Sequence, residues 1–424
     1  MKKVLIVVLA LVIICLVVVF SSPRLRAKMY IKYQYISTNF DDYNEAITVY
    51  TKAIEIDSTF ATSYIRRGWN NYQLGNYQVA LLDFDKAIEL NPNDFEAFAL
   101  RGIYFLDKGK NEKAIEEFNV SISMNPNVDI VYYYRGRAYN GKGEYKKAIS
   151  DFNKCIEYNH NIAEVHARRG WSYKQLNKYE AALKDFNKAE ELGFKKADLY
   201  ENLGYVYDVL LDFEASLQNY KKFIELEPDS TLGYWKAAGA LMQLEKYDES
   251  VPYLDKVIEL DPKNMIAYNY YGHINLYGYE NYKKAEEYYT KAIEFSKEQN
   301  NEYNFLYYFR GKANKELSKT AAANNDFLKA VSIEPEEEVH GFYFRGLSYY
   351  NLEDYEAAIA DFEKAVEMNP NYSYTYEGLG DAYKELSQNK KAAEYYNKYL
   401  SLIDDEEDVA EVKEKLKELG YESR

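Results

Sequence analysis

The chain has 424 residues, and its 53 basic and 68 acidic side chains give a formal charge of −15. Five of the basic residues and none of the acidic ones lie in residues 1–28, so the remaining 396 residues carry −20, which disfavours binding to phosphate backbones of nucleic acids. Aromatic residues make up 17% of the chain, which excludes wholesale disorder, and two cysteines are too few for a disulfide scaffold or a multi-cysteine metal site.

The first segment, residues 1–26, has the pattern of a membrane anchor or a signal segment. Residues 4–20 are an unbroken apolar run, long enough as a helix to cross most of a hydrocarbon core of about 30 Å. A cleaved signal usually has a shorter apolar core, and Pro23 directly follows the small residues Ser21 and Ser22 that a cleavage site would use. We therefore expect a single-pass N-terminal anchor, with a version released by signal cleavage as the alternative. Basic residues flank both ends, and the short basic N-terminus favours an extracytoplasmic position for the rest of the chain.

Residues 27–404 repeat with a period of 34 residues. One position of the repeat, here called the glycine column, is glycine in most repeats. In chain order it holds Gln34, Gly68, Gly102, Gly136, Gly170, Gly204, Ala238, Gly272, Gly311, Gly346 and Gly380. Twelve residues further on is a column of small residues, Ala46, Ala80, Ala114, Ala148, Ala182, Ser216, Ser250, Ala285, Ala323, Ala358 and Ala392. Four residues later comes a column that is aromatic in ten of its eleven members, such as Phe84, Phe118 and Phe152. The pattern predicts eleven repeats.

Each repeat has the pattern of two helices joined by a turn. Apolar residues recur at intervals of three and four, and segments rich in Gly, Asn and Lys, such as residues 74–76, divide each unit. Proline ends six of the repeats, where it stops the second helix. One such hairpin cannot bury its apolar face alone, so the repeats are expected to stack into a solenoid.

At these columns the chain resembles the tetratricopeptide repeat (TPR) family, over nearly nine-tenths of its length. The resemblance implies an all-α fold, a right-handed superhelical solenoid of about eleven helix-turn-helix repeats, whose concave groove binds a protein or peptide. Residues 405–424 fit a capping helix, because an acidic start is followed by one apolar face and Gly420. The period is interrupted near residues 278–301, which predicts a bent or softer joint between two subarrays.

Six repeats carry an arginine directly before the glycine column and an acid sixteen residues after it. The arginines are Arg67, Arg101, Arg135, Arg169, Arg310 and Arg345, and the acids are Asp83, Glu117, Asp151, Asp185, Asp326 and Asp361. The other five repeats have neither residue at these positions. We predict that each arginine binds its acid and joins the two helices of its repeat. The alternative is that these repeats are copies of one ancestor.

No catalytic, metal or phosphate-binding pattern is evident, so we expect no enzyme activity, no cofactor, no metal and no small-molecule substrate. His160 and His166 are expected to be surface histidines and Cys155 a small buried residue. The best functional signal is the position of the three tryptophans, because rigid aromatics and arginine are favoured in binding sites. By the resemblance, the candidate partner-binding residues in the groove are Trp69, Trp171, Trp235, Arg137, Tyr205 and His273.

The sequence thus predicts a membrane-tethered, non-enzymatic scaffold that binds a protein or peptide partner. Two alternatives stay open: a secreted or periplasmic protein released by signal cleavage, and a chaperone or assembly factor that handles precursor or unfolded chains.

Overall fold

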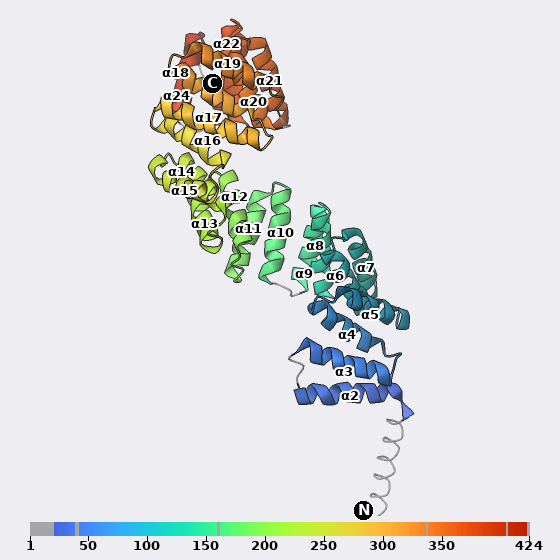
Figure 1. Cartoon of the computed structure of the whole chain (residues 1–424). Coiled ribbons are helices and arrows are strands. Elements are labelled where there is room, and N and C mark those ends of the chain that lie inside the picture. Colours follow the sequence, from blue (N-terminus) through green and yellow to red (C-terminus); the bar gives the residue numbers. More distant parts are fainter. Residues whose placement is uncertain (1–20, 39–41, 159–161, 336–337, 404–405, 422–424) are drawn as a thin grey trace, which may run out of the picture. The chain divides into compact units, whose positions relative to one another are not determined.

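The structure, a computed structural model, describes residues 21–38, 42–158, 162–335, 338–403 and 406–421. Within these residues it contains 23 α-helices and no strand, which confirms the all-α fold class (Figure 1). The chain divides between Leu210 and Leu211 into two compact units.

In the described part of the chain, first and second helices of a repeat alternate, eleven of each. The first helices are α2 (Pro23–Thr38), α4 (Ala61–Gln73), α6 (Phe95–Asp107), α8 (Asp129–Gly141), α10 (Ala163–Gln175), α12 (Ala197–Val209), α14 (Thr231–Gln243), α16 (Met265–His273), α18 (Asn304–Glu316), α20 (Val339–Asn351) and α22 (Ser373–Glu385). The second helices are α3 (Tyr43–Ile56), α5 (Tyr77–Leu90), α7 (Asn111–Met124), α9 (Tyr145–Glu157), α11 (Tyr179–Glu191), α13 (Phe213–Leu226), α15 (Tyr247–Leu260), α17 (Tyr282–Glu298), α19 (Thr320–Val331), α21 (Tyr355–Met368) and α23 (Asn389–Leu400). A short π-helix, η1 (Ile274–Gly278), continues α16, and α24 (Glu406–Glu418) follows the last pair.

The two helices of a repeat meet where an aromatic ring of the second helix lies on a glycine of the first. A Cβ atom at Gly102 would lie 2.6 Å from Cε1 of Phe118, and one at Gly136 would lie 2.8 Å from Cε1 of Phe152. Both rings are fully buried. Interiors are close-packed, so any side chain at these glycines would push the helices apart. The glycine and aromatic columns of the sequence are therefore the two sides of one contact.

The turn between the two helices contains a residue with left-handed backbone geometry. Gly75 has a φ of +80°, and the equivalent position is filled by Leu211 at +61° and by Glu353 at +63°. Only glycine adopts this geometry without steric cost, so the later repeats hold a less favourable residue there. The turn reverses the chain so that the second helix returns along the first.

Each of the six arginines that directly precede the glycine column forms an ion pair with the acid sixteen residues later in the sequence. In the pair of Arg135 and Asp151, Nε donates to one carboxylate oxygen and Nη2 to the other, both at 2.7 Å. The same two-pronged contact joins Arg67 to Asp83, Arg169 to Asp185 and Arg345 to Asp361, and Arg310 binds Asp326 with the same two nitrogens. Each pair connects the two helices of its repeat and is shielded from water on the acid's side.

Four of these arginines in the first unit also reach the second helix of the preceding repeat. Nη1 of Arg101 donates to Asp85 at 2.7 Å, and Nη1 of Arg135 donates to Asn119 at 2.7 Å. Arg169 makes the same contact with Asn153, and Arg67 makes a longer one with Thr51. Each arginine therefore joins three helices, and it links neighbouring repeats as well as the two halves of one repeat.

The glutamate in this series changes the geometry of its pair. Nη2 of Arg101 donates to both oxygens of Glu117, at 2.8 and 2.9 Å, and Nε of Arg101 is buried without a hydrogen-bond partner in the described part of the chain. Because glutamate has one more methylene group than aspartate, its carboxylate lies beyond the position from which an aspartate accepts hydrogen bonds from both Nε and Nη2. Burial raises the pKa of Glu117 despite the opposing effect of Arg101.

The interruptions of the period are absorbed by helices. η1 takes up one extra residue by a wider helical turn, in which the Tyr279 N–H donates to the Ile274 carbonyl at 2.9 Å. The second insertion lengthens α17 to 17 residues, against 14 in α15. Both insertions lie inside the second unit, while the division between the units lies at Leu210 and Leu211.

Helix α24 covers the end of the last repeat. Val412 and Leu416 are buried in the apolar cluster formed by α21, α22 and α23. Lys415 of the same helix places its Nζ 2.8 Å from Glu377 and 3.3 Å from Asp381 of α22. The reason is its position between Val412 and Leu416, which turns the same side of α24 toward α22.

The structure contradicts the expected membrane localisation. Among the helices in the described ranges, none combines the length and the apolar character that crossing a membrane requires. The predicted apolar core, residues 4–20, lies outside the described residues. The first described helix, α2, carries Arg24, Arg26 and Lys28, whose charges make it unsuitable as a membrane span. The single-pass anchor, and with it the extracytoplasmic position of the repeats, is therefore not supported.

Replacing Glu117 with aspartate should stabilise the first unit. The shorter side chain can take the two-pronged position seen at Asp151 and give Nε of Arg101 an acceptor, so we expect the free energy of unfolding to rise by about 1 kcal/mol. The reverse change, Asp151→Glu, should lower it by a similar amount. Urea unfolding followed by circular dichroism measures both effects. Glu116→Asp, at an exposed position of the same helix, is the control. A lower stability of Glu117→Asp would contradict the geometric explanation.

Candidate protein-binding site

The first unit contains a cavity of about 500 Å³ between its first helices. Trp69 of α4, Ile103 of α6 and Tyr134 of α8 line it, and Phe118 reaches it from the second helix α7. Arg66 and Glu96, which also line it, form an ion pair at 2.6 Å. The cavity is thus mainly apolar, with one charged pair among its lining residues.

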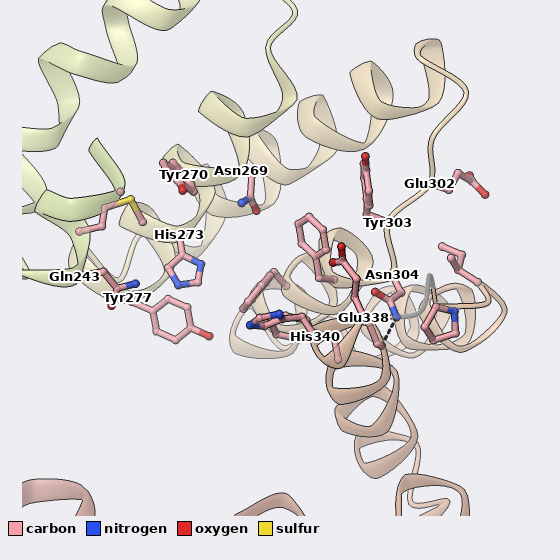
Figure 2. A pocket seen from close by; sticks show the side chains of 18 of the residues that line it. Gln243, Asn269, Tyr270, His273, Tyr277, Glu302, Tyr303, Asn304, Glu338 and His340 are labelled. Carbon is pink, nitrogen blue, oxygen red and sulfur yellow. Dashed lines mark hydrogen bonds between the residues drawn. The ribbon is translucent and has the colours of Figure 1, made fainter. Parts of the chain in front are cut away.

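The second unit contains a larger cavity, of about 760 Å³. Its lining comes mainly from the first helices α14, α16, α18 and α20, together with η1. Figure 2 shows His273 and Tyr277 on one side of the hollow and Glu338 and His340 on the other. Tyr303, Phe309 and Phe344 add aromatic surface.

Two local features open this cavity. The position directly after the glycine column holds Trp69, Arg137, Trp171, Tyr205 and His273 in other repeats, but in α14 it holds Gly239. A Cβ atom at Gly239 would already lie 3.1 Å from the hydroxyl oxygen of Tyr270, so a larger side chain there would enter the cavity. The second feature is η1, whose wider turn carries Tyr277 into the wall.

His273 lies among aromatic rings at the start of η1. Its ring centre is 4.6 Å from that of Tyr277 and 5.0 Å from that of Phe309, and its Nδ1 is 3.4 Å from the hydroxyl oxygen of Tyr289. Burial, together with the nearby charge of Lys312, lowers the pKa of His273 to about 4. The ring is therefore neutral at pH 7.

Two asparagines place amide groups at the cavity. Asn304 donates from Nδ2 to the carbonyl oxygen of Gly341 at 2.7 Å, which ties the start of α18 to α20 (Figure 2). Oδ1 of Asn269, by contrast, is buried and has no hydrogen-bond partner within the described residues. A ligand with a donor group would satisfy this oxygen.

Of the six predicted partner-binding residues, Trp69 and His273 line the two cavities. Trp69 stacks on Tyr72 with ring centres 5.5 Å apart. Trp171 lies edge-on to Tyr145, and Trp235 packs against the buried cluster around Ala238 and Leu254. Neither of these two tryptophans lines either cavity.

Arg137 and Tyr205 hold the same position of the repeat as Trp69 but do not line the cavity of the first unit. The guanidinium of Arg137 stands over the rings of Tyr133 and Tyr134, and its Nη2 is 4.0 Å from Asp107. Tyr205 is 37% exposed, and the ammonium of Lys174 lies 5.0 Å from its ring centre.

Sequence reasoning missed several residues of the larger cavity. Asn269 and Tyr277 stand three residues before and five residues after the glycine column, and no motif marked them. Gly239 had a visible signal, because it is the small member of a column of large side chains.

His166, expected at the surface, is instead buried, with Nδ1 3.0 Å from Asp185. It shares this carboxylate with Arg169. Burial alone would raise the pKa of Asp185, but the hydrogen bonds from Arg169 and His166 hold that pKa below its usual value.

His160 lies outside the described residues. In the part that the structure describes, no three side chains of the metal-binding types come together.

Sequence profiles of the tetratricopeptide repeat family match this chain along most of its length. One profile matches residues 27–60, 131–161, 163–192, 197–230, 233–264 and 373–406, and three others match residues 61–94, 84–116 and 341–372. Together these matches cover more than half of the chain.

Solved structures of repeat proteins are similar to this chain. YrrB, a TPR protein with an unusual peptide-binding site, is 21% identical over 43% of this chain and 95% of its own, with a TM-score of 0.40. Yeast Tom70 is 15% identical over 94% of this chain and 95% of its own, with a TM-score of 0.49. PilF of Pseudomonas aeruginosa is 18% identical over 50% of this chain and 96% of its own, with a TM-score of 0.43. No curated protein sequence matches the chain.

The lowered pKa of His273 predicts a pH dependence of stability. Because the folded state holds this proton less tightly than the unfolded state, its stability is highest above pH 6.5 and falls as the pH drops toward about 4. In His273→Gln this part of the pH dependence should vanish. Urea unfolding of the full chain across that range measures the difference from the original chain. His340→Gln, which changes an exposed ring of the same cavity, is the matched control. Parallel profiles of the chain and His273→Gln would contradict the prediction.

Proposed function

We propose that the chain, which belongs to the tetratricopeptide repeat family, is a non-enzymatic scaffold that binds a protein or peptide partner on the face formed by the first helices of its repeats. The family supplies the general role of a protein-interaction scaffold. The position of the binding face is the proposal made from this chain.

The observation that carries the proposal is that each unit has a cavity between its first helices. Trp69 in the first unit and Gly239 and His273 in the second all occupy the position directly after the glycine column. The arginines of the ion pairs stand directly before the glycine column, so they project from another side of these helices, where they hold the repeats together. One face therefore serves packing, which leaves the other available to a partner.

The lining residues suit recognition of a polypeptide. Aromatic rings offer large contact areas and lose little conformational freedom on binding. The cavities also offer polar groups beside these rings, such as Oδ1 of Asn269, which can accept a hydrogen bond from a peptide N–H. A continuous row of first helices would let an extended segment contact several repeats in turn.

Photo-crosslinking from single positions tests this proposal. A photoreactive phenylalanine analogue at Trp69 or Tyr277 should crosslink a partner in cell extract, and the reaction should be saturable and competed by unlabelled chain. The same analogue at Leu82 or Leu328, which are 68% and 54% exposed on second helices of the same two units, should not. Mass spectrometry identifies the crosslinked species.

Two results would contradict the scaffold. Equal crosslinking from Leu82 and Trp69 would place the binding surface elsewhere. Unsaturable crosslinking from the cavities to many unfolded chains would favour the alternative of a chaperone or assembly factor.

A further inference from the structure

We infer that the cavity of the second unit binds a basic side chain, arginine or lysine, of an extended segment of the partner. This inference rests on the proposed function and adds the chemistry of the ligand.

The cavity is rich in carboxylates. Four glutamates line it, Glu245, Glu302, Glu334 and Glu338, and its lining contains no lysine or arginine. Glu302 is bound to Lys329 at 2.8 Å, and Glu334 is bound to Arg345 at 2.9 Å. Glu245 and Glu338 are exposed and form no ion pair with any residue that the structure describes. Two negative charges at the cavity are therefore available to a cation, and an acidic ligand would be repelled.

Aromatic rings complete an environment that suits a cation with an apolar stem. Tyr277, Phe309 and Phe344 line the cavity, and ring faces attract guanidinium and ammonium groups. The long stems of arginine and lysine pack well on such rings while the charged head reaches a carboxylate. Oδ1 of Asn269 adds an acceptor without a partner among the described residues, and a basic side chain carries donors only.

The last repeat shows the same face already holding a lysine. Lys415 of α24 places Nζ 2.8 Å from Glu377 and 3.3 Å from Asp381, and lies 5.9 Å from the ring centre of Tyr396. Relative to the glycine column, Glu377 and Asp381 occupy the positions of Asn269 and His273. At that end of the second unit the chain itself thus supplies a basic side chain to the binding face.

Lys312, a further cation beside the cavity, does not reverse this preference. Nζ of Lys312 donates to the hydroxyl oxygen of Tyr277 at 3.2 Å, outside the residues that line the cavity. His273 is neutral at pH 7, because burial and Lys312 lower its pKa to about 4. The charges that face a ligand are therefore those of the glutamates.

Three matched peptides test the inference with the full chain. The peptides are short, extended and fluorescein-labelled, and they differ only in a central arginine, glutamine or glutamate that follows a leucine. Fluorescence anisotropy should show the arginine peptide binding about tenfold more tightly than the glutamine peptide, and the glutamate peptide binding most weakly. The preference should shrink as salt is added.

Variants locate the effect in the cavity. The double change Glu245→Gln and Glu338→Gln should weaken binding of the arginine peptide about tenfold and leave the glutamine peptide unchanged. Glu249→Gln with Glu356→Gln, at exposed second-helix positions of the same unit that do not line the cavity, should leave both unchanged. Gly239→Leu, which fills the cavity, should weaken all binding; circular dichroism checks that it is folded.

Binding of all three peptides with equal affinity, or tightest binding of the glutamate peptide, would overturn the inference. If that binding is still lost in Gly239→Leu, the proposed function stands and only the chemistry of the ligand is wrong. Absence of binding by every peptide would also overturn the inference, while saturable crosslinking from Tyr277 would still support the scaffold.

Discussion

The contact between a bare glycine backbone and an aromatic ring is the constraint on which the rest of the structure depends. At Gly102 and Gly136 the ring of the second helix lies too close to admit even a methyl group. This contact fixes how near the two helices of a repeat come. Both cavities lie between first helices, where Trp69, Gly239 and His273 directly follow the glycine column.

The arginine pairs also fix how the packed helices are oriented relative to one another. An aromatic contact alone tolerates small rotations, whereas the two-pronged contact of Arg135 with Asp151 fixes an orientation. The same guanidinium reaches Asn119 of the preceding repeat, so one side chain relates three helices. Where the arginine is missing, a tyrosine takes part of its role: the hydroxyl of Tyr271 donates to Asp255 of the preceding repeat at 2.5 Å.

The periodic part of this structure could be predicted from the sequence, and the cavities could not. Glycines that recur every 34 residues indicate the same helix–helix contact in each repeat, so the helix pairs can be predicted from them. A cavity depends on what neighbouring repeats leave unfilled. Trp69 and Trp235 are the same residue type on the same kind of helix, yet one lines a cavity and the other packs into a buried cluster. The expected localisation depended on one apolar run, without a repeated pattern to support it, and no described helix can span a membrane.

The π-helix η1 shows how such an array tolerates an insertion. One added residue would rotate everything after it by about 100° if the α-helix continued unchanged. The wider turn at Ile274–Gly278 absorbs that rotation locally, so Gly272 still meets Tyr289, now seventeen residues away rather than sixteen. The contact between the two helices is therefore kept although its spacing in the sequence has changed. The same wider turn supplies Tyr277 to the cavity of the second unit, so the residue that disturbs the period also shapes the wall of a cavity.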